Sequence, residues 1–223
     1  MSILEVRNIS YSYQTKYQRI EALRNISCSF ETGRLYSIVG HSGCGKTTLL
    51  SLLAGLDLPD EGDIYVDGSG MRSINRDNYR KNMVSMVYQS FNLFPLLSAI
   101  ENVMFPMELQ GQSKSEAKNN ARQLIELVGL DEKILQQRPM MMSGGEQQRV
   151  AIARAVATGG KILLADEPTG NLDTKNGAVI ADILKSLAHN QNYVVVIVTH
   201  NEELAQQSDI IYHMHDGEII KTT

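Results

Sequence analysis

The chain has 223 residues, with 25 acidic and 21 basic side chains, a net charge of −4 and no tryptophan. This length fits one large domain, or a core domain with an insertion, and the acidic balance argues against a nucleic-acid partner. Two cysteines, Cys28 and Cys44, are too few for a disulfide framework and favour a reducing compartment. The densest apolar run, Tyr193–Thr199, is far shorter than the ~18–20 residues that cross a bilayer.

The first predicted elements are strands. Residues 4–11 and 22–30 alternate apolar and polar side chains, which is typical of half-exposed antiparallel strands. Residues 1–7 alternate in the same way and include an acid, so we expect no secretory signal there. Residues 34–39 indicate a buried strand, residues 48–54 the start of a helix, and residues 62–68 a short strand between glycine turns.

A helical pattern runs from Ser98 to about Leu135, in which Ser115 opens a helix over 116–128 that Gly129 ends. Beyond it, the pattern predicts helices at 145–157, 177–189 and 202–207, and strands at 161–165, 193–198 and 210–213. Alternation of this kind predicts an α/β fold with a mostly parallel sheet. The N-terminal strands form an antiparallel β-subdomain in this prediction, and residues of about 90–140 form an inserted α-helical subdomain.

Residues 40–47 read Gly-His-Ser-Gly-Cys-Gly-Lys-Thr, which is the phosphate-binding loop (P-loop) pattern G-x-x-x-x-G-K-T. Its glycines let backbone N–H groups wrap a polyphosphate, Lys46 adds positive charge, and the Thr47 hydroxyl is a ligand for Mg²⁺. The alternative, a glycine-rich turn without a ligand, is disfavoured by the predicted strand before the loop and helix after it. We therefore predict a P-loop NTPase core that binds ATP and Mg²⁺ through Gly40, His41, Ser42, Gly43, Cys44, Gly45, Lys46, Thr47 and Thr48.

Two acidic residues follow the apolar run 162–165. Asp166 is placed to complete the metal site with Thr47, because carboxyl ends of parallel strands share one edge of a sheet. Glu167 is the predicted general base for the attacking water, a role that typically contributes ~10²–10⁴ in rate. The alternative is a strand that merely ends in solvated acids.

A second anion site is predicted at residues 142–149, which read Met-Ser-Gly-Gly-Glu-Gln-Gln-Arg. Ser143 is expected to cap the following helix, while Gly144 and Gly145 leave its first N–H groups accessible. One P-loop combined with two phosphate-binding helix ends suggests two chains that share two nucleotides. An ordinary helix cap is the alternative.

Together these motifs resemble the nucleotide-binding subunits of ATP-binding cassette (ABC) transporters. The resemblance covers nearly the whole chain and implies a single ABC ATPase domain over residues 1–223. By this resemblance, the signature motif that contacts the γ-phosphate of the opposite subunit consists of Ser143, Gly144, Gly145 and Glu146.

Four further positions match the family's motifs. The resemblance makes Gln89 a sensor of Mg²⁺ and γ-phosphate, His200 a switch histidine, Asp173 part of a loop coupling the two sites, and Tyr13 the aromatic that stacks on adenine. Tyr11 and Tyr17 are close by, so a tyrosine on a strand face is the alternative for Tyr13. The predicted catalytic residues are Lys46, Glu167 and His200, and the predicted metal ligands are Thr47, Gln89 and Asp166.

Residues 143–149 and 168–173 resemble the subclass that serves macrolide and peptide export, lipoprotein release, antimicrobial-peptide resistance and cell division. This implies an ATP-dependent homodimer that powers an integral-membrane permease, with the chain cytoplasmic and peripheral on the inner face of the membrane. The alternative is a mechanotransmission or regulatory ATPase that acts on a membrane partner without moving a solute. A cassette for DNA repair or translation is disfavoured because no long coiled coil, second cassette or basic arm is present.

Three other features stand outside the motifs. Met140–Met142 is expected to be flexible core packing, with a redox sensor as the alternative. His213 and His215 are two residues apart on a predicted strand, a spacing that places two imidazoles on one face but lacks a third metal ligand. The apolar run 91–97 lies where the family receives its membrane partner, so we expect some of Phe91, Leu93 and Phe94 to be exposed.

Overall fold

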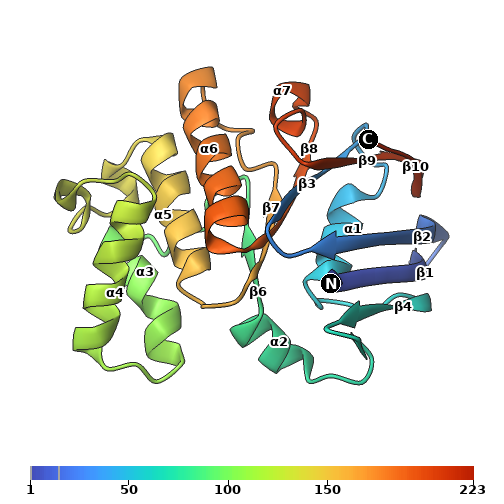
Figure 1. Cartoon of the computed structure of the whole chain (residues 1–223), viewed down its shortest axis with the longest axis horizontal. Helices are drawn as coiled ribbons and strands as arrows, with labels where there is room; N and C mark the ends of the chain where they lie inside the picture. Colours follow the sequence, from blue (N-terminus) through green and yellow to red (C-terminus); the bar gives the residue numbers. More distant parts are fainter. Residues whose placement is uncertain (1, 15) are drawn as a thin grey trace.

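The computed structural model describes residues 2–14 and 16–223 and contains two β-sheets with helices packed against them (Figure 1). The smaller sheet is antiparallel throughout, with the strand order β2-β1-β4-β5. Its strands are β1 (Ser2–Gln14), β2 (Arg19–Glu31), β4 (Glu61–Val66) and β5 (Ser69–Gly70). The predicted N-terminal antiparallel unit is therefore confirmed.

The larger sheet has the order β10-β9-β3-β8-β7-β6, and every neighbouring pair except β9 and β10 is parallel. Its strands are β3 (Arg34–Val39), β6 (Val84–Val87), β7 (Ile162–Asp166), β8 (Val194–Thr199), β9 (Ile210–His215) and β10 (Glu218–Thr222). This mostly parallel sheet confirms the predicted α/β fold.

Both faces of the larger sheet are buried, which explains why its strands are continuous apolar runs. Along β8, Val194, Val196 and Val198 pack into a core with α1 (Lys46–Leu53) and the smaller sheet. Val195 and Ile197 point the other way, into a second core with the helices. The strand is therefore fixed from two sides, and its carboxyl end is held rigidly.

The remaining helices surround this framework. They are α2 (Arg76–Asn82), α3 (Ala99–Leu109), α4 (Lys114–Leu127), α5 (Gly144–Val156), α6 (Thr174–Gln191) and α7 (Glu202–Ala205), with short 3₁₀ segments at Glu132–Ile134 and Pro139–Met141. Helices α3, α4 and α5 gather on the side of the molecule opposite β1, β2 and β4 (Figure 1). No helix in the described part of the chain has the length and apolar character needed to cross a membrane.

The start of α4 differs from the prediction. Ser113 rather than Ser115 precedes the helix, because the Ser113 hydroxyl and the Glu116 carboxylate form a reciprocal capping box. The prediction also missed α2, β5, β6 and β10. These elements are short, and α2 contains a single buried side chain, Tyr79, so it has no apolar periodicity to detect.

Candidate nucleotide-binding and catalytic site

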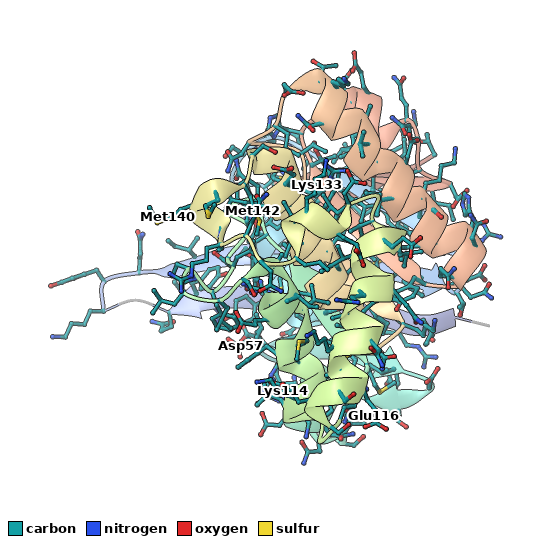
Figure 2. All side chains as sticks on the ribbon, turned by 90° about the vertical axis from the view of Figure 1, so that its left-hand side faces the viewer. Asp57, Lys114, Glu116, Lys133, Met140 and Met142 are labelled. Carbon is teal, nitrogen blue, oxygen red and sulfur yellow. The ribbon has the colours of Figure 1, made fainter. Side chains whose placement is uncertain are left out.

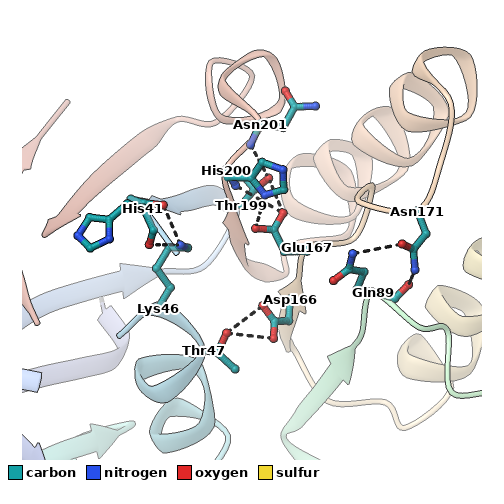
Figure 3. A network of polar contacts seen from close by, with 11 residues as sticks. His41, Lys46, Thr47, Gln89, Asp166, Glu167, Asn171, Thr199, His200 and Asn201 are labelled. Carbon is teal, nitrogen blue, oxygen red and sulfur yellow. Dashed lines mark hydrogen bonds and ion pairs between the residues drawn. The ribbon is translucent and has the colours of Figure 1, made fainter. Parts of the chain in front are cut away.

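The predicted site residues converge where the parallel strands of the larger sheet end (Figure 3). The P-loop follows β3, Gln89 follows β6, Asp166 ends β7 and His200 follows β8. The register pairs Val39 with Thr199 and Asp166 with Val198, so these chain segments end at the same level. Crevices at the carboxyl ends of strands are the usual ligand sites of open α/β sheets.

The P-loop has a preformed shape. Gly45 has φ 103° and a Cβ at this position would lie 2.5 Å from the Ala22 carbonyl oxygen, so only glycine fits. The Lys46 ammonium group folds back and donates to the carbonyl oxygens of Gly40 (2.8 Å) and His41 (3.0 Å). The positive charge is thus held within the loop by two backbone carbonyl groups.

A cavity of about 680 Å³ lies over this loop. Of the predicted site residues it is lined by Tyr13, Ser42, Gly43, Gly45, Lys46, Thr47, Thr48, Gln89, Asp166, Glu167 and His200. Gly40, His41 and Cys44 belong to the loop but do not line the cavity, and the Cys44 side chain is buried. The loop therefore presents its backbone and Lys46 to a ligand, while Cys44 packs into the core.

Two of the three predicted metal ligands lie side by side. The Thr47 hydroxyl is 3.4 Å and 3.3 Å from the two carboxylate oxygens of Asp166. Burial raises the pKa of Asp166, the nearby Glu167 carboxylate adds to the rise, and Thr47 and Lys46 oppose it. A hydroxyl and a carboxylate are the hard oxygen donors that Mg²⁺ prefers, so this part of the site fits the ion.

Glu167 is held by three donors from the end of β8. Its Oε1 is 2.7 Å from His200 Nδ1, and its Oε2 accepts from the Thr199 hydroxyl at 3.2 Å and the His200 N–H at 3.4 Å (Figure 3). The residue has φ 47°, a left-handed conformation that is unusual for a glutamate. Backbone strain of this type persists only where surrounding contacts hold it, and it gathers at functional sites.

Gln89 is connected to the segment between β7 and α6. Its side-chain amide donates to Asn171 Oδ1 at 3.2 Å, and the Asn171 amide donates to the Gln89 carbonyl oxygen at 2.9 Å. Gly170 lies against the Gln89 side chain, since a Cβ on Gly170 would be 2.9 Å from Gln89 Nε2. The cavity-lining glutamine is thus hydrogen-bonded to the loop that carries Asp173.

The signature residues lie outside the cavity, at the start of α5. Ser143 caps this helix, its hydroxyl donates to Glu146 Oε2 at 2.7 Å, and the Glu146 N–H donates back at 3.3 Å. These hydrogen bonds lower the pKa of Glu146. The predicted cap is present as a full capping box. The Ser143, Gly144, Gly145 and Glu146 set does not meet the P-loop within one chain.

Asp173 also lies outside the cavity and caps a helix. Its carboxylate accepts from the backbone N–H and the side-chain amide of Asn176, both at 2.8 Å, at the start of α6. These bonds lower the pKa of Asp173. The predicted coupling residue is thus fixed at a helix N-terminus, with Leu172 and Asn171 just before it.

The sequence prediction missed one wall of the cavity. Ile20, Glu21, Ala22 and Arg24 of β2 line it, as do Asp216 and Gly217 of the β9–β10 turn. Ile20 could have been identified as a cavity residue from its pairing with Tyr13 across β1 and β2. This pairing follows from the antiparallel register and not from any motif. Tyr13 is 46% exposed, and its hydroxyl is 3.1 Å from the Thr48 hydroxyl.

Comparison with known proteins decides the family. The sequence profile of a family described as ABC transporter matches residues 23–170, which include the P-loop, the signature residues, Asp166 and Glu167. The chain belongs to the ABC transporter family. It is therefore an ABC-type ATP-binding cassette with ATP hydrolase activity, as the motifs predicted.

Individual ABC proteins resemble the chain along nearly its full length. An uncharacterized ABC transporter ATP-binding protein of Bacillus subtilis, YclH, is 41% identical, over 97% of this chain and 95% of the relative. The lipoprotein-releasing system ATP-binding protein LolD 2 of Rhodopirellula baltica is 40% identical, over 96% of this chain and 88% of the relative. A dimeric, post-hydrolysis structure of the cassette MJ0796 of Methanocaldococcus jannaschii, bound to ADP and Pi, has a TM-score of 0.90 and 35% identity, covering 99% of this chain and 97% of that one.

The methionine run of this ABC cassette differs from the prediction. Met142 is buried, but Met140 and Met141 are 93% and 71% exposed, and Met140 projects from the edge of the helical side (Figure 2). Only one of the three side chains is core packing. The other two are on the 3₁₀ segment Pro139–Met141, a single turn in which Pro139 is buried and both methionines are exposed, just before the Ser143 cap.

Proposed function

We propose that two copies of this chain bind two ATP molecules between them, hydrolyse them with Glu167 and drive a membrane permease. The observation that carries the proposal is the separation of the two anion-binding elements. The P-loop lines the cavity, whereas the helix start at Ser143 and Gly144 does not. A second chain in antiparallel contact brings its own helix start to the cavity, which gives each nucleotide two sets of backbone N–H donors.

In this proposal the P-loop backbone and Lys46 hold the β- and γ-phosphates, and Tyr13 packs against the adenine with Ile20 beside it. Thr47, Asp166 and Gln89 hold Mg²⁺, which neutralises charge on the phosphates. The support for the first two ligands is their mutual distance of 3.3–3.4 Å and the raised pKa of Asp166, a cost of burial that a bound cation offsets.

Glu167 accepts a proton from the water that attacks the γ-phosphorus, and His200 orients both the carboxylate and the terminal phosphate. The three donors that hold Glu167 support this, because a base must be fixed within hydrogen-bond reach of the water, about 3 Å between the two oxygen atoms. Lys46 stabilises the charge that develops on the transferred group. Gln89 then reports on site occupancy through its two hydrogen bonds with Asn171, which lies two residues before Asp173.

The permease is proposed to dock in an apolar groove of about 440 Å³ between the larger sheet and α3. Phe94, Phe105 and Leu109 line the groove and are 40%, 36% and 62% exposed. The Phe94 loop is pinned by Asn102, which is fully buried and bonds to the backbone of Phe94 on both its N–H and its carbonyl. A rigid apolar surface of this kind is typical of a protein docking site.

Arg154 specifies the partner's chemistry further. It lies 5.4 Å from the Phe94 ring centroid and donates to the backbone carbonyls of Asn92 and Phe91 rather than to a carboxylate. Burial lowers its pKa, which indicates that its charge is poorly solvated. A short helix with apolar side chains and one acidic residue fits this groove, since the acid compensates Arg154. Such docking places the chain at the inner, cytoplasmic face of the membrane.

The shared nucleotide site, the docking groove and the identity of the partner are tested separately. Glu167→Gln protein mixed with Mg-ATP is expected to elute from size-exclusion chromatography as a dimer, and elution as a monomer at saturating ATP contradicts the shared site.

For the groove, Leu109→Asp is expected to remove the chain from purified membranes, whereas Leu127→Asp, on the exposed part of α4, retains membrane association. Equal retention of both variants rejects the groove. Mass spectrometry of the co-purified membrane protein separates solute transport from mechanotransmission.

A further inference from the structure

Three side chains from two segments meet at the rim of the nucleotide cavity. His41 comes from the P-loop, His215 ends β9, and Asp216 begins the turn into β10. Their ligand atoms all lie within 4.8 Å of one another. Within residues 2–14 and 16–223 this is the only group of three histidine, cysteine or carboxylate side chains at such a spacing.

The hydrogen bonds of His41 fix which nitrogen is available. Its Nδ1 is 2.9 Å from the Ser42 carbonyl oxygen, which only accepts, so Nδ1 carries a proton. In the neutral ring the Nε2 lone pair then faces Asp216 Oδ1 at 3.2 Å. Two acceptors at this distance require a cation between them, either a proton or a metal ion. Histidines that bind metals usually donate their other N–H to a carbonyl or carboxylate, as His41 does.

Each imidazole nitrogen lies near one carboxylate oxygen of Asp216 at about the spacing of neighbouring ligands around a tetrahedral ion, and one ligand atom from each of the three residues lies within 4.8 Å of the others. Metal–ligand bonds of about 2.0–2.1 Å in a tetrahedron place neighbouring ligand atoms about 3.4 Å apart. His41 Nε2 is 3.2 Å from one oxygen of Asp216, and His215 Nδ1 is 3.4 Å from the other. The two rings lie 5.0 Å apart at 71° to each other, and both are about half exposed, which leaves room for water as a fourth ligand.

The backbone holds the two segments together without any ion. Gly217 donates to the Cys44 carbonyl oxygen at 3.0 Å, so the β9–β10 turn is bonded to the P-loop. On the other side, a Cβ on Gly40 would lie 2.2 Å from the Met214 carbonyl oxygen, so this close approach requires glycine. Asp216 and Gly217 have φ of 43° and 84°, typical of a two-residue hairpin turn. The ligands are therefore preorganised.

We propose that His41, His215 and Asp216 bind a divalent transition-metal ion of the Zn²⁺ class at the rim of the nucleotide cavity. This site is separate from the Mg²⁺ site of Thr47 and Asp166, and its imidazole ligands favour Zn²⁺ over Mg²⁺. The sequence placed His213 and His215 on one face of a predicted strand, without a third metal ligand. His213 instead bonds to the Thr223 hydroxyl at 3.0 Å, and the P-loop supplies the second ring.

The test is Zn²⁺ binding to the whole chain after treatment with EDTA, without nucleotide, measured by competition with a fluorescent chelator. One Zn²⁺ per chain is expected, and Co²⁺ in its place is expected to give the visible absorption of a tetrahedral site. His215→Gln and Asp216→Asn are each expected to weaken Zn²⁺ binding by 10-fold or more. Asparagine tolerates positive φ, so Asp216→Asn keeps the turn.

His213→Gln and His200→Gln are the matched controls and are expected to bind Zn²⁺ as the unmodified chain does. Unchanged binding in His215→Gln, or a 10-fold loss in either control, overturns the ligand assignment. Thermal unfolding tests whether His215→Gln loses Zn²⁺ binding merely because it is misfolded. Zn²⁺ is expected to raise the melting temperature of the unmodified chain but not of His215→Gln, and both are expected to melt at the same temperature without metal.

Discussion

The imidazole of His200 lies 2.7 Å from the carboxylate of Glu167, across the neighbouring ends of β8 and β7. The two side chains differ in environment, since Glu167 is only 16% exposed and His200 is 72% exposed. Glu167, the proposed base, is thus held by hydrogen bonds from the end of β8, while the exposed His200 ring is accessible to a ligand. This relationship makes Glu167 the first target for mutation.

Glu167→Gln is expected to lower ATP hydrolysis by ~10²-fold or more, because it removes the proton acceptor but keeps the side-chain volume. ATP binding is expected to persist. Phosphate release and nucleotide calorimetry measure the two effects. Glu202→Gln, on an exposed glutamate of the nearby α7, is the control and is expected to turn over normally. Near-normal turnover in Glu167→Gln would show that another group is the base.

Lys46→Ala is expected to weaken ATP binding and hydrolysis together. The ammonium group now bonds to two P-loop carbonyls, and its charge-assisted contacts with phosphates are worth ~1.5–3 kcal/mol each. Loss of one such contact corresponds to a rise of about 10–100-fold in Kd. Calorimetry with ATP measures it. An unchanged Kd would mean that the loop does not hold the polyphosphate.

Gly144→Asp is expected to abolish ATP-driven dimerisation and turnover while leaving nucleotide binding to the monomer nearly intact. A Cβ at Gly144 meets only ordinary contacts, the nearest at 3.4 Å from Leu172, so the monomer tolerates a side chain there. Gly145 is unsuitable, because a Cβ would lie 2.4 Å from Asn176 Oδ1. The new carboxylate stabilises the helix start but repels a phosphate.

Mixing Gly144→Asp with Lys46→Ala sharpens this test. In the mixed dimer one site combines an intact P-loop with an intact signature helix, and the other site carries both defects. Part of the ATPase activity is therefore expected to return, provided that one competent site turns over alone. Normal hydrolysis by Gly144→Asp alone would place the signature helix away from the nucleotide.

Glu146→Gln tests the pH dependence of the capping box on α5. Hydrogen bonds from Ser143 lower the pKa of Glu146 in the folded chain, so its ionised form stabilises the fold above the unfolded pKa of about 4.3. This contribution is lost as the pH falls through the lowered folded pKa. The difference in urea midpoint between the unmodified chain and Glu146→Gln is expected to shrink from pH 7 to pH 4. If this difference in urea midpoint grows toward pH 4, the ionised Glu146 carboxylate does not stabilise the fold. In a Ser143→Ala background, the effect of Glu146→Gln on the urea midpoint at pH 7 is expected to be smaller.

Much of the geometry of the candidate site was predictable because its motifs are encoded locally. The P-loop needs glycines within eight residues, Asp166 ends a buried strand with Glu167 directly after it, and Ser143 and Glu146 form the capping box of α5. The predicted helix boundaries were less accurate, since α4 is capped by Ser113 and not by the predicted Ser115. Whether Ser113 or Ser115 starts α4 depends on which serine reaches a glutamate three residues on.

What the sequence alone determined was the family and the order of the motifs, because backbone turns, caps and buried strands follow from neighbouring residues. The tertiary structure decided which distant residues meet. Ile20 lies opposite Tyr13 because of the register of β1 and β2. Asn171, which follows β7, bonds to Gln89, which follows the neighbouring strand β6. His41 lies near His215 and Asp216 because β3 and β9 are paired. Such contacts depend on sheet order and register, which the chain fixes only when its two cores pack on both faces of the larger sheet.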